Sequence, residues 1–102
     1  MKMRKMIMAA APAIVGALLA GPALATGKIK CNVKPADMKP IAALKTELTR
    51  QGWTIAKAKV DGGCYEVYGV MPETGRVEAY FDPATFEKLL VLQRGKVVFK
   101  KG

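Results

Sequence analysis

Apolar and polar residues follow three different patterns along this chain, and each pattern predicts a different kind of segment. Residues 6–20 form an uninterrupted apolar run. Between residues 38 and 51 apolar side chains recur at helical spacing, and from residue 53 to residue 81 they largely alternate with polar ones, as in strands. These patterns predict an N-terminal apolar segment, one amphipathic helix and a run of antiparallel strands.

The first apolar run has the flanks of an export signal. A basic stretch at residues 2–5 precedes it, and Pro22 and the small-residue sequence at 23–25 end it. We therefore predict a cleavable signal peptide over residues 1–25 and a periplasmic or secreted protein. The alternative is a retained membrane anchor, because the run approaches the roughly 20 residues that a spanning helix needs. The break at Pro22 and the alanine-rich composition favour cleavage, with no stable membrane insertion afterwards.

A helix is predicted over residues 38–51. Asp37 can accept hydrogen bonds from its first turn, and Pro40 is tolerated in that turn because its missing N–H would have no intrahelical partner. Gly52 is expected to end the helix, since glycine accepts a left-handed conformation without a Cβ clash. The apolar side of this helix contains Ile41, Leu44 and Leu48.

Three strands are predicted next, over residues 53–60, 64–71 and 76–81. Glycines in the segment 61–63 indicate a hairpin turn, and residues 72–75 indicate the return turn. The apolar alternation changes face within the first strand, which predicts a bulge near Lys57. The third strand alternates regularly and places Val77, Ala79 and Phe81 on one face.

The pattern beyond Phe81 leaves alternatives open. Asp82 can either turn the chain or cap a short helix over residues 84–88. Residues 89–92 are too few to classify by period, and residues 96–100 form either a last strand or a loose tail. We predict an α+β fold in a single domain, residues 26–102, with one amphipathic helix packed on a small antiparallel sheet of three to four strands.

The predicted domain is small enough to need a covalent cross-link for stability. Its 77 residues bury a core that supplies only a few kcal/mol of net stability. After export to an oxidising compartment, Cys31 and Cys64 can pair. A redox-active pair usually has two residues between its cysteines, and a metal site needs more ligands. We therefore predict one structural disulfide between Cys31 and Cys64.

Composition excludes several kinds of chemistry. The chain contains no histidine and no serine, which removes Ser-His and Cys-His catalysis and histidine-ligated metal or haem. Carboxylate chemistry stays formally open at Glu66, Glu78 and Asp82, and would require Glu66 and Glu78 to lie in a cleft with raised pKa values. We predict no catalytic residue, no cofactor and no metal site.

The predicted domain is moderately basic. Fourteen Lys and Arg outnumber eight Asp and Glu within residues 26–102, which gives a net charge of +6. This charge fits a solvated surface, and it leaves open a basic face for anionic polymers or acidic partners. Export argues against nucleic acid as the ordinary partner.

Several segments together resemble a known family: Gly52-Trp53 after the helix, residues 61–68 at the first hairpin, and residues 75–85 up to an Asp-Pro-x-Thr sequence. They resemble the PepSY domain, in particular its small secreted proteobacterial members that consist of this domain alone. The likeness covers residues 31–92, so the tail 93–102 lies outside it. Family members typically have glycine after that threonine, where this chain has Phe86, and a helical turn there is one possible consequence.

The resemblance implies binding rather than chemistry. It suggests an exported module that regulates or inhibits a secreted or periplasmic protein such as a peptidase. The alternative is a structural or envelope accessory protein that contacts membrane or polyanions through its basic residues. No catalytic or cofactor residue is carried over from the family, and the oligomeric state is not predicted.

A candidate partner surface consists of tyrosines beside acidic residues on the second and third strands. The competing interpretation is that the tyrosines pack against the sheet or helix, as we expect for Trp53. A free edge of the third or last strand could also accept a peptide by strand addition. The candidate surface residues are Tyr65, Glu66, Tyr68, Glu78 and Tyr80.

Overall fold

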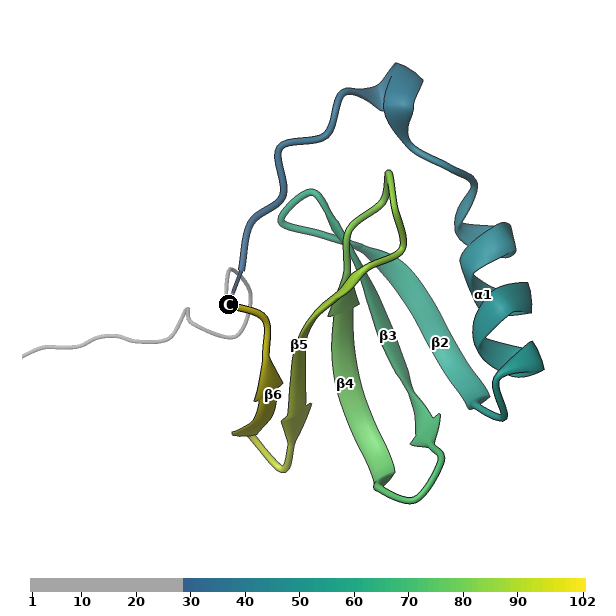
Figure 1. The fold of residues 1–102 in the computed structure, drawn as a ribbon, viewed down its shortest axis with the longest axis vertical. Helices are drawn as coiled ribbons and strands as arrows, with labels where there is room; N and C mark the ends of the chain where they lie inside the picture. The colour runs from purple at the N-terminus through teal and green to yellow at the C-terminus, as the bar shows by residue number, and fades with distance from the viewer. Residues whose placement is uncertain (1–28) are drawn as a thin grey trace, which may run out of the picture.

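The computed structural model describes residues 29–102, so the predicted signal peptide lies outside the described residues. A short 3-10 turn, η4 (Pro35–Asp37), and one helix, α1 (Ile41–Arg50), precede a five-stranded sheet (Figure 1). Each strand pairs antiparallel with its neighbours in sequence, which gives the order β2-β3-β4-β5-β6. The strands are β2 (Thr54–Asp61), β3 (Cys64–Met71), β4 (Gly75–Phe81), β5 (Lys88–Gln93) and β6 (Lys96–Lys100). Within residues 29–102 no helix is long and apolar enough to cross a membrane.

The predicted helix is confirmed, but its predicted start is wrong. Asp37 belongs to η4 and does not cap α1, and the backbone of Met38 and Pro40 is extended. Pro40 explains the later start, because a proline keeps the preceding residue out of the helical region. The predicted stop is confirmed, with Gly52 at a φ of 100°. Trp53 N–H donates to the Leu48 carbonyl at 3.0 Å, which satisfies a carbonyl of the last helical turn.

The first three strands agree with the predicted pattern. The register of β2 and β3 shifts between Ile55 and Lys57, which confirms the bulge. The predicted hairpin and return turns are present, with Asp61 opposite Cys64 and Met71 opposite Gly75.

The predicted strand number, three to four, is wrong, because residues 88–93 and 96–100 add β5 and β6. Strand β5 lacks alternation since both its faces are covered. Val91 lies in the core beneath α1, whereas Leu90 and Leu92 pack on the other face. The segment 93–102, which lay outside the family likeness, therefore belongs largely to the sheet.

The segment after Phe81 is a turn and not a helix. The Asp82 carboxylate accepts hydrogen bonds from the N–H groups of Ala84 and Thr85, at 2.7 and 3.3 Å. Phe86 has a φ of 67°, in the left-handed region that favours glycine. The resemblance implies glycine at this position, and Phe86 adopts the conformation that glycine suits.

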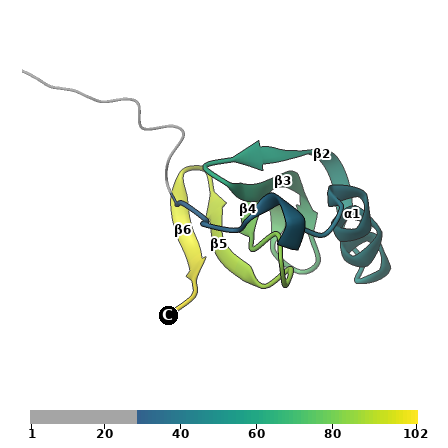
Figure 2. The same ribbon diagram turned by 90° about the horizontal axis from the view of Figure 1, so that it is seen from above.

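Apolar side chains fill two separate clusters, one on each face of the sheet. The larger cluster lies between α1 and the sheet and includes Leu44, Leu48, Trp53, Tyr65, Val67, Val77, Ala79, Phe81 and Val91. Figure 2 shows α1 beside β2, at the end of the sheet away from β6. The burial of Trp53 in this cluster is as predicted. The smaller cluster, on the opposite face, contains Cys64, Tyr80, Leu90 and Leu92.

The predicted disulfide joins Cys31 to Cys64, with an S–S distance of 2.06 Å. It ties the segment before η4 to the start of β3, and the Cys31 N–H donates to the Gly62 carbonyl at 2.9 Å. Ile29 and Cys31 thereby pack against the smaller cluster. The segment 29–31 consequently covers one part of the sheet face that α1 leaves open.

Candidate binding site on the open face of the sheet

The candidate site lies on the face of the sheet opposite α1, which we call the open face. The strand register aligns two rows of side chains across this face. One row runs through Lys59, Glu66, Tyr80, Leu90 and Lys100. The other runs through Lys57, Tyr68, Glu78, Leu92 and Val97. Period-two alternation on each strand brings these residues to the same face.

The Tyr80 hydroxyl is the centre of a polar network that connects the two rows. Its oxygen lies 2.8 Å from Glu78 Oε2, 3.0 Å from Glu66 Oε2 and 3.2 Å from Asp61 Oδ2. Tyr68 donates to Glu78 Oε2 over 3.5 Å. These contacts give the acidic side chains of the open face partners within the sheet.

Burial and hydrogen bonding act in opposite directions on Glu66. Burial raises the pKa of this carboxyl, but hydrogen bonds with Glu78, Tyr68 and Tyr80 and the charge of Lys59 lower the pKa below its usual value of 4.5. Lys59 Nζ lies 3.7 Å from Glu66 Oε1. Glu66 is therefore a buried carboxylate held in its charged form by its neighbours.

The two tyrosines of the network resist ionisation. Burial, followed by hydrogen bonds with Glu78 and Glu66, raises the pKa of Tyr80 well above its usual value of 10. For Tyr68 the hydrogen bond with Glu66 is the largest cause of a raised pKa, and burial adds to it. Both hydroxyls stay protonated, and so remain hydrogen-bond donors, throughout the physiological pH range.

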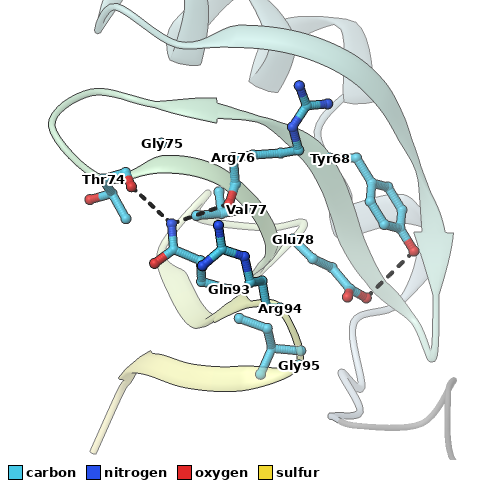
Figure 3. Close-up of a pocket in the computed structure, with 10 residues that line it drawn as sticks. Tyr68, Thr74, Gly75, Arg76, Val77, Glu78, Gln93, Arg94 and Gly95 are labelled. Carbon is cyan, nitrogen blue, oxygen red and sulfur yellow. Dashed lines mark hydrogen bonds between the residues drawn. The ribbon is translucent and has the colours of Figure 1, made fainter.

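A hollow of about 600 Å³ lies at one end of the open face (Figure 3). Strands β3 to β5 and the β5–β6 turn form its walls, and its lining residues include Tyr68, Arg76, Glu78, Gln93 and Arg94. Gln93 braces the hollow, because its Nε2 donates to the Thr74 carbonyl at 2.8 Å and to the Arg76 carbonyl at 3.4 Å. The hollow is thus bounded by two hairpin ends that Gln93 holds together.

Two further hollows adjoin the first and share lining residues with it. On one side a hollow of about 360 Å³ shares Tyr68, Arg76 and Val77. On the other side a hollow of about 410 Å³ shares Leu92 and Gly95 and extends along Leu90, Val97 and Lys100 to Ile29. Because neighbouring hollows share lining residues, the three lie in a row across the open face, from β2 to β6. We call this row of hollows the open-face trough.

The five candidate surface residues do not form one surface. Tyr65 lies on the helix side, where it is buried and donates a hydrogen bond to the Lys39 carbonyl. Glu66 and Tyr80 are buried within the network. Tyr68 and Glu78 are half-buried and line the trough.

Sequence reasoning missed the arginines of the trough. Arg76 lies two residues before Glu78 on β4, so the alternation of this strand predicts that both side chains point to the same face. Arg94 lies in the β5–β6 turn, and its place depended on two strands that the pattern did not resolve.

Glu66 does not meet the condition for carboxylate catalysis. Glu66 is only 2% exposed, and its pKa is lowered where a general acid would need it raised. Among residues 29–102 no group of three or more acidic or cysteine side chains is placed to hold a metal ion. The features that remain are a trough with polar and apolar walls, which can bind an extended ligand.

Fold and site thus define a small disulfide-bonded α+β protein with a row of hollows on the open face of its sheet. The family model described as "Peptidase propeptide and YPEB domain" matches residues 9–89, and the chain belongs to this PepSY family. Domains of the family are commonly associated with peptidase propeptides and inhibitory modules and are typically non-catalytic. No curated protein and no solved structure matches the chain. Strand β6 and most of β5 lie beyond the matched range.

Proposed function

We propose that this protein is an exported PepSY binding module that regulates or inhibits a secreted or periplasmic protein such as a peptidase. The observation that carries the proposal is the open-face trough, because α1 covers only one face of the sheet and leaves the other accessible. Membership of the PepSY family supports the regulatory role.

Two observations support an exported location. The N-terminal sequence has the order of a signal peptide, with a basic start, an apolar run and small residues. The Cys31–Cys64 disulfide suits an oxidising compartment, since cytosolic thiols are kept reduced.

The proposal is tested by capturing partners from periplasmic extract on immobilised 26–102 protein. Val97 and Val60 provide matched variants, because they are 57% and 56% exposed on opposite edge strands and only Val97 lines the trough. Wild type and Val60→Gln are expected to retain the same protein, and Val97→Gln is expected to retain less of it. If the partner is a peptidase, its activity should fall in proportion to the bound module.

Two results would overturn the proposal. One is capture that is identical with Val97→Gln and Val60→Gln. The other is the absence of any protein partner together with salt-sensitive retention on heparin or anionic vesicles, which would favour the envelope accessory role.

A further inference from the structure

The open face already accommodates an extended stretch of polypeptide. Residues 29–31 lie against it without helical structure, and Ile29 and Cys31 pack on the cluster that contains Tyr80 and Leu90. Ile29 also lines one end of the trough. The remainder of the trough continues the same surface past Leu92 toward Arg76.

Among the described residues, the charged side chains of the trough that form no side-chain hydrogen bond or salt bridge are positive. The acidic side chain that lines it, Glu78, accepts hydrogen bonds from Tyr80 and Tyr68, and the buried Glu66 next to it pairs with Lys59. Within residues 29–102, the guanidinium groups of Arg76 and Arg94 form no side-chain hydrogen bond or salt bridge. Guanidinium groups bind carboxylates with paired N–H donors, so these two arginines complement an acidic ligand.

An exposed apolar side chain lies beside the hollow that holds the two arginines. It belongs to Val97, which is 57% exposed and lies opposite Leu92, a nearly buried residue in the wall shared by two of the hollows. Gly95 leaves space at this point, because a Cβ there would meet no atom within 4 Å. An apolar side chain of a ligand can pack here while neighbouring side chains reach the arginines.

The position of Glu78 favours a peptide over a polyanion. This carboxyl lines the same hollow as Arg76 and Arg94, so a ligand with closely spaced anionic groups would meet repulsion inside the trough. An extended peptide directs every second side chain to the same face, so it can place two carboxylates four residues apart and an uncharged side chain midway between them, opposite Glu78.

On the basis of the proposed function, we infer that the open-face trough binds an extended partner segment that presents acidic and apolar side chains in turn on the face that contacts the sheet. Arg76 and Arg94 bind its carboxylates, and Val97, beside Leu92, contacts an apolar side chain.

The inference is tested by fluorescence anisotropy on the folded 26–102 protein, with a dye-labelled peptide that has glutamate and valine in turn at every second position and threonine at the positions between them. A peptide with glutamine in place of glutamate is the ligand control. The protein variant is Arg76→Gln/Arg94→Gln, and the matched control is Arg50→Gln, since Arg50 lies on α1 across the sheet and pairs with Glu47. The double variant is expected to bind the acidic peptide about tenfold or more weakly, and Arg50→Gln to bind like wild type.

Equal binding of the acidic and glutamine peptides would overturn the inference, as would wild-type affinity in the double variant. Retention on heparin or anionic vesicles that depends on Arg76 and Arg94, without peptide binding, would assign the arginines to a polyanion and overturn it as well. If the double variant still captures the periplasmic partner, the inference fails and the proposed function stands. If the peptide binds while no partner is captured, the proposed function fails and the inference stands.

Discussion

The Tyr80 hydroxyl has a single hydrogen, yet three carboxylate oxygens lie within 3.2 Å of its oxygen. It can donate to only one of them at a time. When Tyr80 donates elsewhere, Glu66 still pairs with Lys59 and Glu78 still accepts from Tyr68. This arrangement makes the open face sensitive to the loss of any one donor.

Replacing Tyr80 with phenylalanine removes the central donor and leaves buried carboxylate oxygens without it. The free energy of unfolding is expected to fall by about 1–3 kcal/mol, the cost of leaving buried polar groups unsatisfied. Tyr68→Phe is the control, because its hydroxyl makes a longer contact of 3.5 Å at a less buried position. Urea unfolding measures both variants, and equal losses would contradict the central role of Tyr80.

Glu66 makes the free energy of unfolding decrease as the pH falls. Its pKa is lowered in the folded protein, so its contribution is present above the usual value of 4.5 and is lost as pH falls through the folded pKa. Glu66→Gln is therefore expected to flatten the decline of unfolding free energy on acidification, which a pH series of urea titrations measures. Glu73→Gln, at an exposed turn, is expected to leave the slope as in wild type. Parallel curves for wild type and Glu66→Gln would refute this.

Phe86 combines a strained backbone with useful side-chain contacts. Its ring lies 6.5 Å from the Tyr65 ring, and Lys39 Nζ lies 4.9 Å from its centre. These contacts offset the cost of a φ of 67°. Both Phe86→Gly and Phe86→Ala lose the ring, so a comparison of the two isolates the backbone.

The glycine variant of Phe86 is expected to be more stable than the alanine variant by about 1 kcal/mol, because only glycine tolerates positive φ without a Cβ penalty. Thermal unfolding of the two proteins tests this. At Ala43, an exposed position in α1, the order should be reversed, so that the protein with alanine is more stable than the variant with glycine. Greater stability of Phe86→Ala would show that the backbone at Phe86 is not strained.

At the scale of elements, the sequence predicted those segments in which one face is exposed to solvent and the other is buried. Strand β4 alternates because Val77, Ala79 and Phe81 face the helix, and this contrast is visible in the pattern. Strand β5 is apolar on both faces, and all five residues of β6 are exposed, so neither has an alternation to detect. The start of α1 was misplaced because Asp37, a good capping residue, is used in a separate 3-10 turn.

The same reasoning explains how much of the site was predictable. Tyr68 and Glu78 were named because they lie on strands with a clear pattern. The pattern could not predict that they line a trough, because the far wall of the trough consists of β5, β6 and the turn between them, which the pattern did not resolve. Tyr65 is the same residue type as Tyr68, but it is an odd number of residues away on the same strand. Its side chain therefore points to the opposite face, toward the helix.

The β2–β3 hairpin depends on close approach to the segment before η4. A Cβ on Gly63 would lie 2.3 Å from the Cys31 carbonyl oxygen, at a φ of 83°. Gly95 is a matched control, because it has a φ of 80° and a Cβ there would meet nothing within 4 Å. Gly63→Ala is expected to destabilise the oxidised protein more than Gly95→Ala, by urea unfolding, and to raise the fraction of free thiol. Equal effects would mean that φ alone matters at Gly63.

For the whole molecule, the disulfide is expected to be the largest single source of stability. Closing a loop between residues 33 positions apart contributes roughly 3–4 kcal/mol in the chain-entropy model. Cys31→Ala should lower the free energy of unfolding by about this amount. Reduced wild-type protein is the control, since it keeps both side chains. Thiol titration of folded, purified protein should find no free thiol, and two titratable thiols would contradict the pairing.

The sequential order of the strands also sets an order of events in folding. Every strand pairs with the next one in sequence, so the sheet can grow hairpin by hairpin without waiting for distant segments to meet. Joining Cys31 to Cys64 is a chemical step that takes seconds to hours, depending on the oxidant. The sheet can therefore form before the covalent link closes. Until the link closes, the segment around Ile29 is not covalently held against Tyr80 and Leu90, and the rate of oxidation sets how long that stage lasts.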